Sequence, residues 1–206
     1  MTDFAKLIDG YHRFRSSDWT RQRARWAELA DQQSPKVMVV ACSDSRVDPA
    51  TIFDTSPGEM FVVRNVANLV PPFEADGGRH GVSAALEFAV TQLEVPEIVV
   101  LGHGGCGGIA AALSRRFEGA SPGEGGFIAK WIDLLDEARD HVAACGGGTA
   151  MLEHEGIKVS LANLRSFPCI RAREREGRLK LHGAFFAIED GVLHVLDEDS
   201  GAFAPC

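Results

Sequence analysis

The stretch KVMVVACSDSR at residues 36–46 decides how this chain folds, and EIVVLGHGGCGG at residues 97–108 repeats its design. Each begins with an apolar run that predicts a buried strand and continues into polar or glycine residues. Two neighbouring parallel strands would bring both polar ends to the carboxyl edge of one sheet. That edge is where α/β proteins build their sites.

Three metal-binding side chains follow these strands, namely the thiols of Cys42 and Cys106 and the imidazole of His103. Two thiolates and one imidazole suit zinc, and three protein ligands leave the fourth tetrahedral position open for chemistry. Two alternatives stay open at this level. Cysteines at strand ends also serve as core filler, and the glycines around His103 also suit a loop that binds an anion.

Three separated motifs, at residues 41–46, 61–72 and 102–108, resemble the β-class carbonic anhydrases. The similarity runs from about residue 33 to the turn at residues 190–191. It implies a carbonate dehydratase, a zinc lyase that converts carbon dioxide to bicarbonate and a proton through attack by zinc-bound hydroxide. It also implies one Zn²⁺ per chain, held by Cys42, His103 and Cys106.

Asp44 and Arg46 are the expected catalytic pair beside this metal. A carboxylate close to zinc either binds the metal or accepts a hydrogen bond from the metal's water. A guanidinium with two parallel donors would hold Asp44 off the metal and keep it ionised. We therefore expect Asp44→Asn to abolish most turnover while zinc stays bound, and Arg46→Ala to let Asp44 capture the metal.

The resemblance assigns the substrate pocket to Gln33, Phe61, Val66, Phe88 and Gly107. Gln33 would donate a hydrogen bond to substrate in the neighbouring subunit's site, and Gly107 would offer a backbone N–H to a product oxygen. From the residues alone, Gln33 is a surface side chain and the three apolar residues are core packing.

The whole chain predicts an α/β fold with a central, mostly parallel sheet flanked by helices. Its 206 residues, 45% hydrophobic and 24% charged, suit a single domain over residues 1–206. Residues 1–33 form a helical arm in this prediction, and residues 34–206 form the α/β core. The large apolar residues of the arm, together with the resemblance, predict packing on a second subunit in a homodimer or a multiple of dimers. The alternative is that the arm packs on the chain's own core.

Periodicity and punctuation give the remaining elements. Helix is expected over residues 2–30, with Ser17 or Asp18 capping its second half, and Gly77-Gly78 end a loop. Further helices are expected over residues 82–93, 127–144 and 149–166, the last one stopped by Phe167-Pro168. Further strands are expected over residues 60–64, 178–188 and 192–197, the last two as a hairpin or a parallel edge.

Charge and cysteine usage bound the partners and the compartment. The net charge of −8 argues against nucleic acid, and no run of 18 apolar residues exists to span a membrane. The N-terminus lacks the basic start and apolar core of a signal peptide. Five scattered cysteines indicate a reducing cytoplasm, with plain thiols at Cys145, Cys169 and Cys206.

Within the family, the resemblance is closer to the plant-like branch than to the bicarbonate-inhibited bacterial branch. The latter carries a Trp three residues before the first zinc cysteine and a Tyr in the later strand, where this chain has Val39 and Phe186. Arg64 is shared, but alone it cannot form a three-residue anion site. We expect a structural role for Arg64 and no cooperative inactivation at low pH.

Other functions remain to be separated from this one. Related proteins hydrolyse carbon disulfide or carbonyl sulfide, and a zinc-holding oligomeric scaffold would have no catalysis. The presence of Asp44, Arg46 and Gln33 argues against a scaffold. The glycines match neither a dinucleotide-binding fingerprint nor a P-loop, which disfavours a nucleotide-binding module.

Overall fold

The computed structural model describes residues 2–76 and 78–206, so Gly77 of the expected loop lies outside the described residues. The chain divides into two compact units, Met1–Ser34 and Pro35–Cys206. The assignment of the whole chain to one domain stays a prediction.

The first unit consists of three short helices, α1 (Phe4–Ser16), α2 (Asp18–Arg21) and α3 (Arg23–Asp31). Asp3 caps α1, because its carboxylate accepts the N–H of Lys6 at 3.0 Å. The break falls at Ser17, as expected, but the Ser17 hydroxyl donates back to the carbonyl of Arg13 at 2.7 Å. The expectation that this side chain caps the second half is therefore wrong. Exposed apolar residues of α1 are Phe4, Leu7, Ile8, Tyr11 and Phe14.

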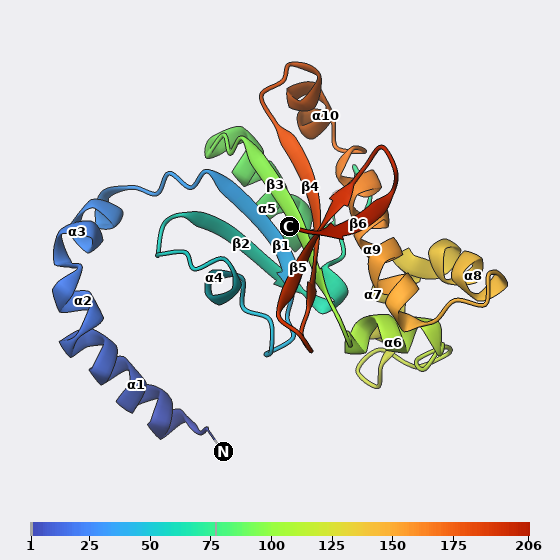
Figure 1. Ribbon diagram of the computed structural model, residues 1–206, viewed down its shortest axis with the longest axis horizontal. Coiled ribbons are helices and arrows are strands. Elements are labelled where there is room, and N and C mark those ends of the chain that lie inside the picture. Colours follow the sequence, from blue (N-terminus) through green and yellow to red (C-terminus); the bar gives the residue numbers. More distant parts are fainter. Residues whose placement is uncertain (1, 77) are drawn as a thin grey trace. The chain divides into compact units, whose positions relative to one another are not determined.

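The second unit is built on a six-stranded sheet in the order β2-β1-β3-β4-β5-β6 (Figure 1). The first four strands in this order are parallel: β2 (Met60–Asn65), β1 (Val37–Cys42), β3 (Glu97–His103) and β4 (Lys180–Ala187). The last two, β5 (Val192–Asp197) and β6 (Ala202–Pro205), are antiparallel. The expected mostly parallel sheet is confirmed, β4 and β5 form the hairpin alternative, and β6 was not predicted.

The period of two in β1 divides its side chains between the two faces of the sheet. Met38 and Val40 are buried in the larger core, which contains side chains of α5 (Gly81–Glu87), α9 (Thr149–Leu164) and α10 (Pro168–Arg175). Val39 and Ala41 are buried on the other face, in a cluster that includes Ile52 of α4 (Pro49–Ile52). Full burial of a valine or methionine side chain contributes roughly 1.5–3 kcal/mol. The strand ends are thereby fixed in a rigid core.

In the second unit, two of the expected helices are interrupted, and α10 was not predicted. The helix expected over residues 82–93 is α5 followed by a π-helical turn, η2 (Phe88–Gln92). The helix over residues 127–144 is α7 (Gly126–Ile132), a 3-10 turn, η3 (Asp133–Leu135), and α8 (Asp136–Ala144). Helix α9 ends at Leu164, and Pro168 is the first residue of the next helix, α10, a position that suits proline.

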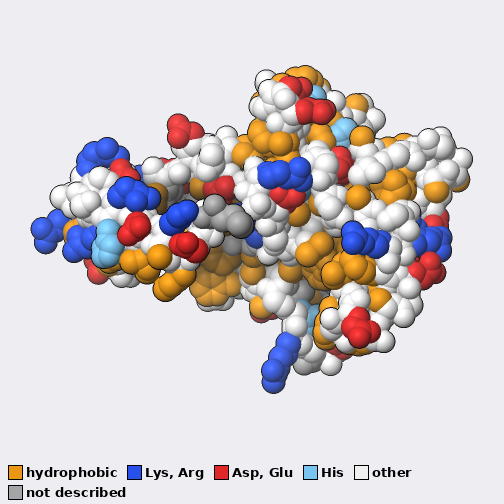
Figure 2. Space-filling view, turned by 90° about the horizontal axis from the view of Figure 1, so that it is seen from below, with side chains coloured by type: hydrophobic (Ala, Val, Ile, Leu, Met, Phe, Trp, Pro, Cys, Tyr) orange, Lys and Arg blue, Asp and Glu red, His pale blue; other side chains and the backbone are white. Residues whose placement is uncertain are grey.

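Charged side chains are dispersed on the face of the molecule drawn in Figure 2, where red and blue groups are interspersed among hydrophobic and uncharged ones. Among the described residues, none of the helices is both long enough and apolar enough to cross a membrane.

Gly126 and Gly81 each begin a seven-residue helix and provide a matched pair of substitutions. A Cβ at Gly126 would lie 2.6 Å from the carbonyl oxygen of Ala120, so the backbone there would have to move. A Cβ at Gly81 meets no described atom within 4 Å.

We predict that Gly126→Ala lowers the free energy of unfolding by about 1–3 kcal/mol. Gly81→Ala should leave it unchanged or raise it by up to about 1 kcal/mol. Urea unfolding of both variants measures this difference, and equal midpoints would show that the chain around Ala120 yields freely.

Candidate metal centre

The parallel register brings the three candidate ligands together. Ala41 of β1 pairs with Leu101 of β3, so Cys42 and His103 leave neighbouring strands at the same edge of the sheet. A tight turn follows, with Gly105 at a φ of +66°, and Cys106 is the N-cap of α6 (Gly107–Leu113). All three side chains are buried, and their ligand atoms lie within 4.8 Å of one another.

The geometry of these atoms fits zinc. The two cysteine sulfurs are 3.9 Å apart, and zinc–sulfur bonds of about 2.3 Å in a tetrahedron require roughly 3.8 Å. His103 Nδ1 lies 3.0 Å from the carbonyl oxygen of Gly104, which makes Nδ1 the protonated nitrogen. Nε2 is then the free ligand atom, and it is buried with no hydrogen-bond partner among the described residues. An orphaned ring nitrogen beside two sulfurs indicates a site for a metal ion.

The protein alone prepares one of the two thiolates. A hydrogen bond from the Cys106 thiol lowers the pKa of Cys42 to about 4, against the opposing effect of burial. The backbone amides of Asp44 and Ala67 also lower the pKa of Cys42. The charge on Cys42 and burial together raise the pKa of Cys106, although the amides of Gly108 and Ile109 reach its sulfur.

The amides of Gly108 and Ile109 at the N-terminus of α6 lower the pKa of Cys106, but they do not offset the effects of Cys42 and burial. The second thiolate requires a cation to offset its repulsion by the first.

Asp44 and Arg46 form the expected pair. The Arg46 Nε donates to Asp44 Oδ1 at 2.9 Å and its Nη2 to Oδ2 at 2.7 Å, a bidentate arrangement. The backbone N–H of Arg46 also donates to Oδ1 at 2.9 Å. These contacts, the Arg46 guanidinium above all, hold the pKa of Asp44 well below its usual range. Asp44 is consequently an ionised acceptor in a fixed orientation beside the metal ligands.

Arg64 fastens the loop that carries this pair. Its Nε donates to the carbonyl of Cys42 at 2.8 Å, and its Nη2 donates to the carbonyls of Asp44 at 2.6 Å and Val47 at 3.0 Å. Its Nη1 lies 3.3 Å from a carboxylate oxygen of Asp48, which caps α4. The guanidinium is thus committed to the protein backbone.

Two of the expected pocket residues lie close to the candidate metal ligands. Gly107 directly follows Cys106, and a Cβ there would meet no described atom within 4 Å, so its surroundings are open. Val66 lies against the first turn of α6, since a Cβ on Gly108 would approach its Cγ1 to 2.7 Å. Trp131 fixes Val66 by donating its indole N–H to the Val66 carbonyl at 2.8 Å.

Phe61 and Phe88 lie elsewhere in the same unit. Their rings stack with centroids 5.9 Å apart, and Phe61 pairs with Met38, whereas Cys42 pairs with Asn65. Four residues of strand separate Phe61 from Asn65, or about 13 Å. The chain therefore does not bring these two rings to its own metal ligands. Gln33 belongs to the first unit, and its role stays a prediction.

A strained segment, η1 (Val66–Asn68), was not anticipated from the sequence. Ala67 and Asn68 both have left-handed backbone conformations, with φ of 64° and 48°, at a cost of about 1 kcal/mol or more each. Asn65 holds the segment by bonding both the N–H and the carbonyl of Leu69 at 2.9 Å. The strain directs the amide of Ala67 to the sulfur of Cys42.

A buried carboxylate beside the site was also missed. Glu153 of α9 accepts the N–H of Cys106 at 2.9 Å. Burial raises the pKa of Glu153, and the amides of Cys106 and Gly105 act against that rise. The sequence offered an indication, because Glu153 shares the inward spacing of Gly156, Ile157, Ser160, Leu161 and Leu164, all buried.

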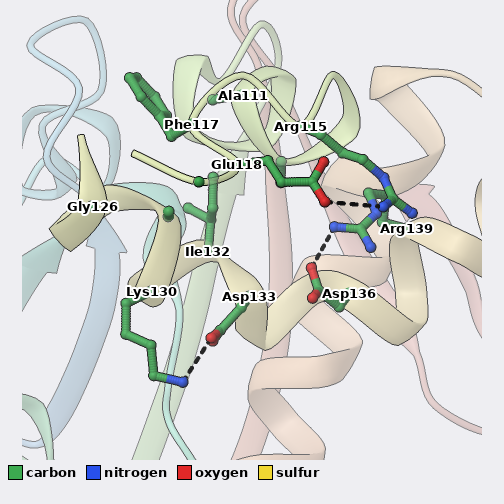
Figure 3. Close-up of a pocket in the computed structure, with 13 residues that line it drawn as sticks. Ala111, Arg115, Phe117, Glu118, Gly126, Lys130, Ile132, Asp133, Asp136 and Arg139 are labelled. Atoms are coloured by element: carbon green, nitrogen blue, oxygen red, sulfur yellow. Dashed lines mark hydrogen bonds and ion pairs between the residues drawn. The ribbon is translucent and has the colours of Figure 1, made fainter. Parts of the chain in front are cut away.

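A separate cavity of about 350 Å³ lies between the ends of α6, α7 and α8 (Figure 3). Ion pairs line it, including Lys130 with Asp133 at 2.8 Å and Arg139 with Asp136. None of the metal ligands contributes to its wall. Its charged groups are already paired with one another, so it is distinct from the metal centre.

The fold and the site define a class, an α/β protein with a buried Cys2His centre at the carboxyl edge of a parallel sheet and an arginine-held aspartate beside it. The family model described as carbonic anhydrase matches residues 37–193. A carbonic anhydrase of Pseudomonas aeruginosa is 38% identical over 199 residues, which is 96% of this chain and 89% of that protein.

Solved structures agree with this result. The β-carbonic anhydrase CcaA superposes with a TM-score of 0.90 at 30% identity, covering 98% of this chain and 91% of its own. One of two tetrameric β-carbonic anhydrases from Sordaria macrospora gives a TM-score of 0.79 at 27% identity, with 98% of each chain covered. This chain belongs to the β-class carbonic anhydrase family.

Proposed function

We propose that this chain catalyses the zinc-dependent, reversible hydration of carbon dioxide to bicarbonate and a proton, with one Zn²⁺ per chain. The observation that carries the proposal is the buried set of Cys42, His103 and Cys106, next to an aspartate that Arg46 holds through both carboxylate oxygens. When bound, zinc supplies the Lewis acidity that makes water a nucleophile near neutral pH. The similarity to carbonic anhydrases over most of the chain supports the assignment.

The chain's own residues orient the reaction. Asp44 is ionised and acts as a hydrogen-bond acceptor, because the Arg46 guanidinium donates a hydrogen bond to each of its carboxylate oxygens. A carboxylate held in this way accepts a proton-bearing group in one orientation and does not become a metal ligand itself. Val66 supplies an apolar wall for a small neutral substrate. Gly107, with open space around it, offers its backbone N–H to an oxygen of the product.

A second copy of the chain completes the pocket in this proposal. Phe61 and Phe88 lie too far from the chain's own ligands to line its pocket, and Phe88 is 44% exposed near the edge strand β2. These rings would therefore face the site of a partner chain, and Gln33 would donate its hydrogen bond to substrate in that same site. The exposed apolar residues of α1 fit a partner surface in the same assembly. The tetrameric relatives from Sordaria macrospora support an oligomer.

We place the chain in the plant-like branch and not in the bicarbonate-inhibited branch. Arg64 is the residue shared with the inhibited branch. Its N–H groups donate to three backbone carbonyls and to the carboxylate of Asp48. A guanidinium in this state has little capacity left to bind bicarbonate. A cytoplasmic location is part of the same proposal, supported by the five cysteines, which the structure leaves as free thiols.

Stopped-flow measurement of carbon dioxide hydration by the zinc-replete protein, with a chelator-treated sample as control, tests the function. Chelator-sensitive hydration is expected. Absence of hydration with zinc bound would favour the scaffold alternative, and turnover of carbonyl sulfide or carbon disulfide alone would favour the hydrolase.

We predict that Asp44→Asn lowers kcat at least about a hundredfold while one zinc per chain is retained. The amide removes the ionised acceptor but keeps the size of the side chain. Asp48→Asn, four residues further along the same loop, is the matched control, and asparagine preserves its role as a helix cap. Comparable activity of the two variants would exclude the assigned role of Asp44.

The pH dependence follows from the charges at the metal. Two thiolates cancel the charge of Zn²⁺, which weakens its Lewis acidity relative to a site with three histidines. Asp44 does not titrate in the working range, because its pKa is far below the usual value. We therefore predict that kcat rises with pH between about 6 and 9, and a flat profile over that range would contradict the charge argument.

Inhibition by bicarbonate separates the two branches. With Arg64 committed to the backbone, we predict simple hyperbolic inhibition and no cooperative loss of activity at low pH. Initial rates against bicarbonate concentration at pH 7 measure this, and a sigmoidal curve would place the chain in the inhibited branch.

A further inference from the structure

Glu153 is a buried carboxylate in contact with the backbone of Cys106. Its residue is 5% exposed, and it lies on α9, the longest helix of the second unit. Its Oε1 accepts the N–H of Cys106 at 2.9 Å, and the carboxylate also accepts the N–H of Gly105. Two consecutive amides of the turn that carries a metal ligand are therefore held by one side chain.

The helix that carries Glu153 is fixed against the same turn. The side chain of Ile157 packs against Gly102, so closely that a Cβ on this glycine would lie 2.7 Å from it. Gly156 lies against the side chain of Ile109. Helix α9 is therefore closely packed against the end of β3 and the first turn of α6. Glu153 consequently reaches the turn from a rigid base.

The turn held by Glu153 also supports the catalytic pair. The carbonyl of Gly105 accepts Nη2 of Arg46 at 2.9 Å, and the same nitrogen donates to Asp44. The positive φ of Gly105 gives this peptide its orientation. The Glu153 carboxylate, the Gly105 peptide, Arg46 and Asp44 form one continuous chain of hydrogen bonds.

We propose that Glu153 is a positioning residue for the carbonic anhydrase reaction. By holding the amides of Gly105 and Cys106, it sets the place of the metal ligand Cys106 and, through the Gly105 carbonyl, the orientation of Arg46 and Asp44. Hydrogen-bonding reach is the property that matters, and the charge of Glu153 is not required. This inference rests on the proposed function.

Two substitutions separate reach from charge. Glu153→Gln keeps an acceptor oxygen at the same distance without the charge, and Glu153→Asp keeps the charge but is one methylene too short. We expect Glu153→Asp to lower kcat/KM about 10- to 100-fold, the usual effect of losing a partner that orients a metal ligand. Glu153→Gln should stay within about threefold of the wild type, because its carbonyl oxygen still accepts the amides. Glu155→Gln is the control on the same helix, where Glu155 forms a half-buried ion pair with Lys158 at 2.8 Å.

A metal-release measurement provides a readout independent of turnover. Zinc transfer to a chromogenic chelator should be faster from Glu153→Asp and unchanged for Glu153→Gln and Glu155→Gln. If the wild type holds zinc but does not hydrate carbon dioxide, the proposed function fails, while zinc release still tests the role of Glu153.

The link to Arg46 is tested by combining substitutions at saturating zinc. In an Arg46→Ala background, Glu153→Asp should lower kcat much less than it does in the wild type, because the chain of hydrogen bonds is already broken. The proposal would be overturned if Glu153→Asp lowered kcat by the same factor in both backgrounds. A fully active Glu153→Asp variant, with Glu153→Gln either active or impaired, would also overturn it.

Discussion

Two cysteine sulfurs 3.9 Å apart in a buried site cannot both be ionised unless a cation lies between them, and this constraint shapes the region around them. The pKa of Cys42 falls to about 4, whereas that of Cys106 rises. His103 presents a buried, unbonded nitrogen to the same point, as far as the described residues show. Zinc satisfies all three groups at once.

The surrounding residues hold the two sulfurs and the loops that carry them. Backbone amides from the strained turn at Ala67, from Asp44 and from the first turn of α6 reach the two sulfurs. Arg64 secures the loop after β1, and Arg46 joins that loop to the turn after β3. The two halves of the site therefore come from neighbouring strands but are tied by arginine side chains. This arrangement holds an ionised aspartate, by its contacts with Arg46, next to the candidate metal ligands.

Much of this could be predicted from local sequence. Apolar runs ending in Cys42 and His103 identified neighbouring strands, and the short spacing of Asp44 and Arg46 indicated a local pair; the register and the bidentate contact agree with both. What the sequence did not indicate depends on tertiary contacts. The strain at Ala67, the backbone contacts of Arg64 and the contact of Glu153 with Cys106 involve segments 17 or more residues apart, to which local periodicity is insensitive.

The missed elements have a similar cause. In the sequence, Pro168 predicts the end of a helix, although a proline is equally suited to begin the next one, and the packing of Ile170 in the core distinguishes the two. The distance of Phe61 and Phe88 from the ligands likewise follows from strand register and not from the motif itself.

X-ray absorption spectroscopy at the zinc K edge of the purified protein tests the central claim most directly. The predicted spectrum has two sulfur scatterers at about 2.3 Å and two nitrogen or oxygen scatterers at about 2.0–2.1 Å, one from His103 and one from a non-protein ligand. A protein without stoichiometric zinc, or a coordination sphere with any other number of sulfurs, would contradict it.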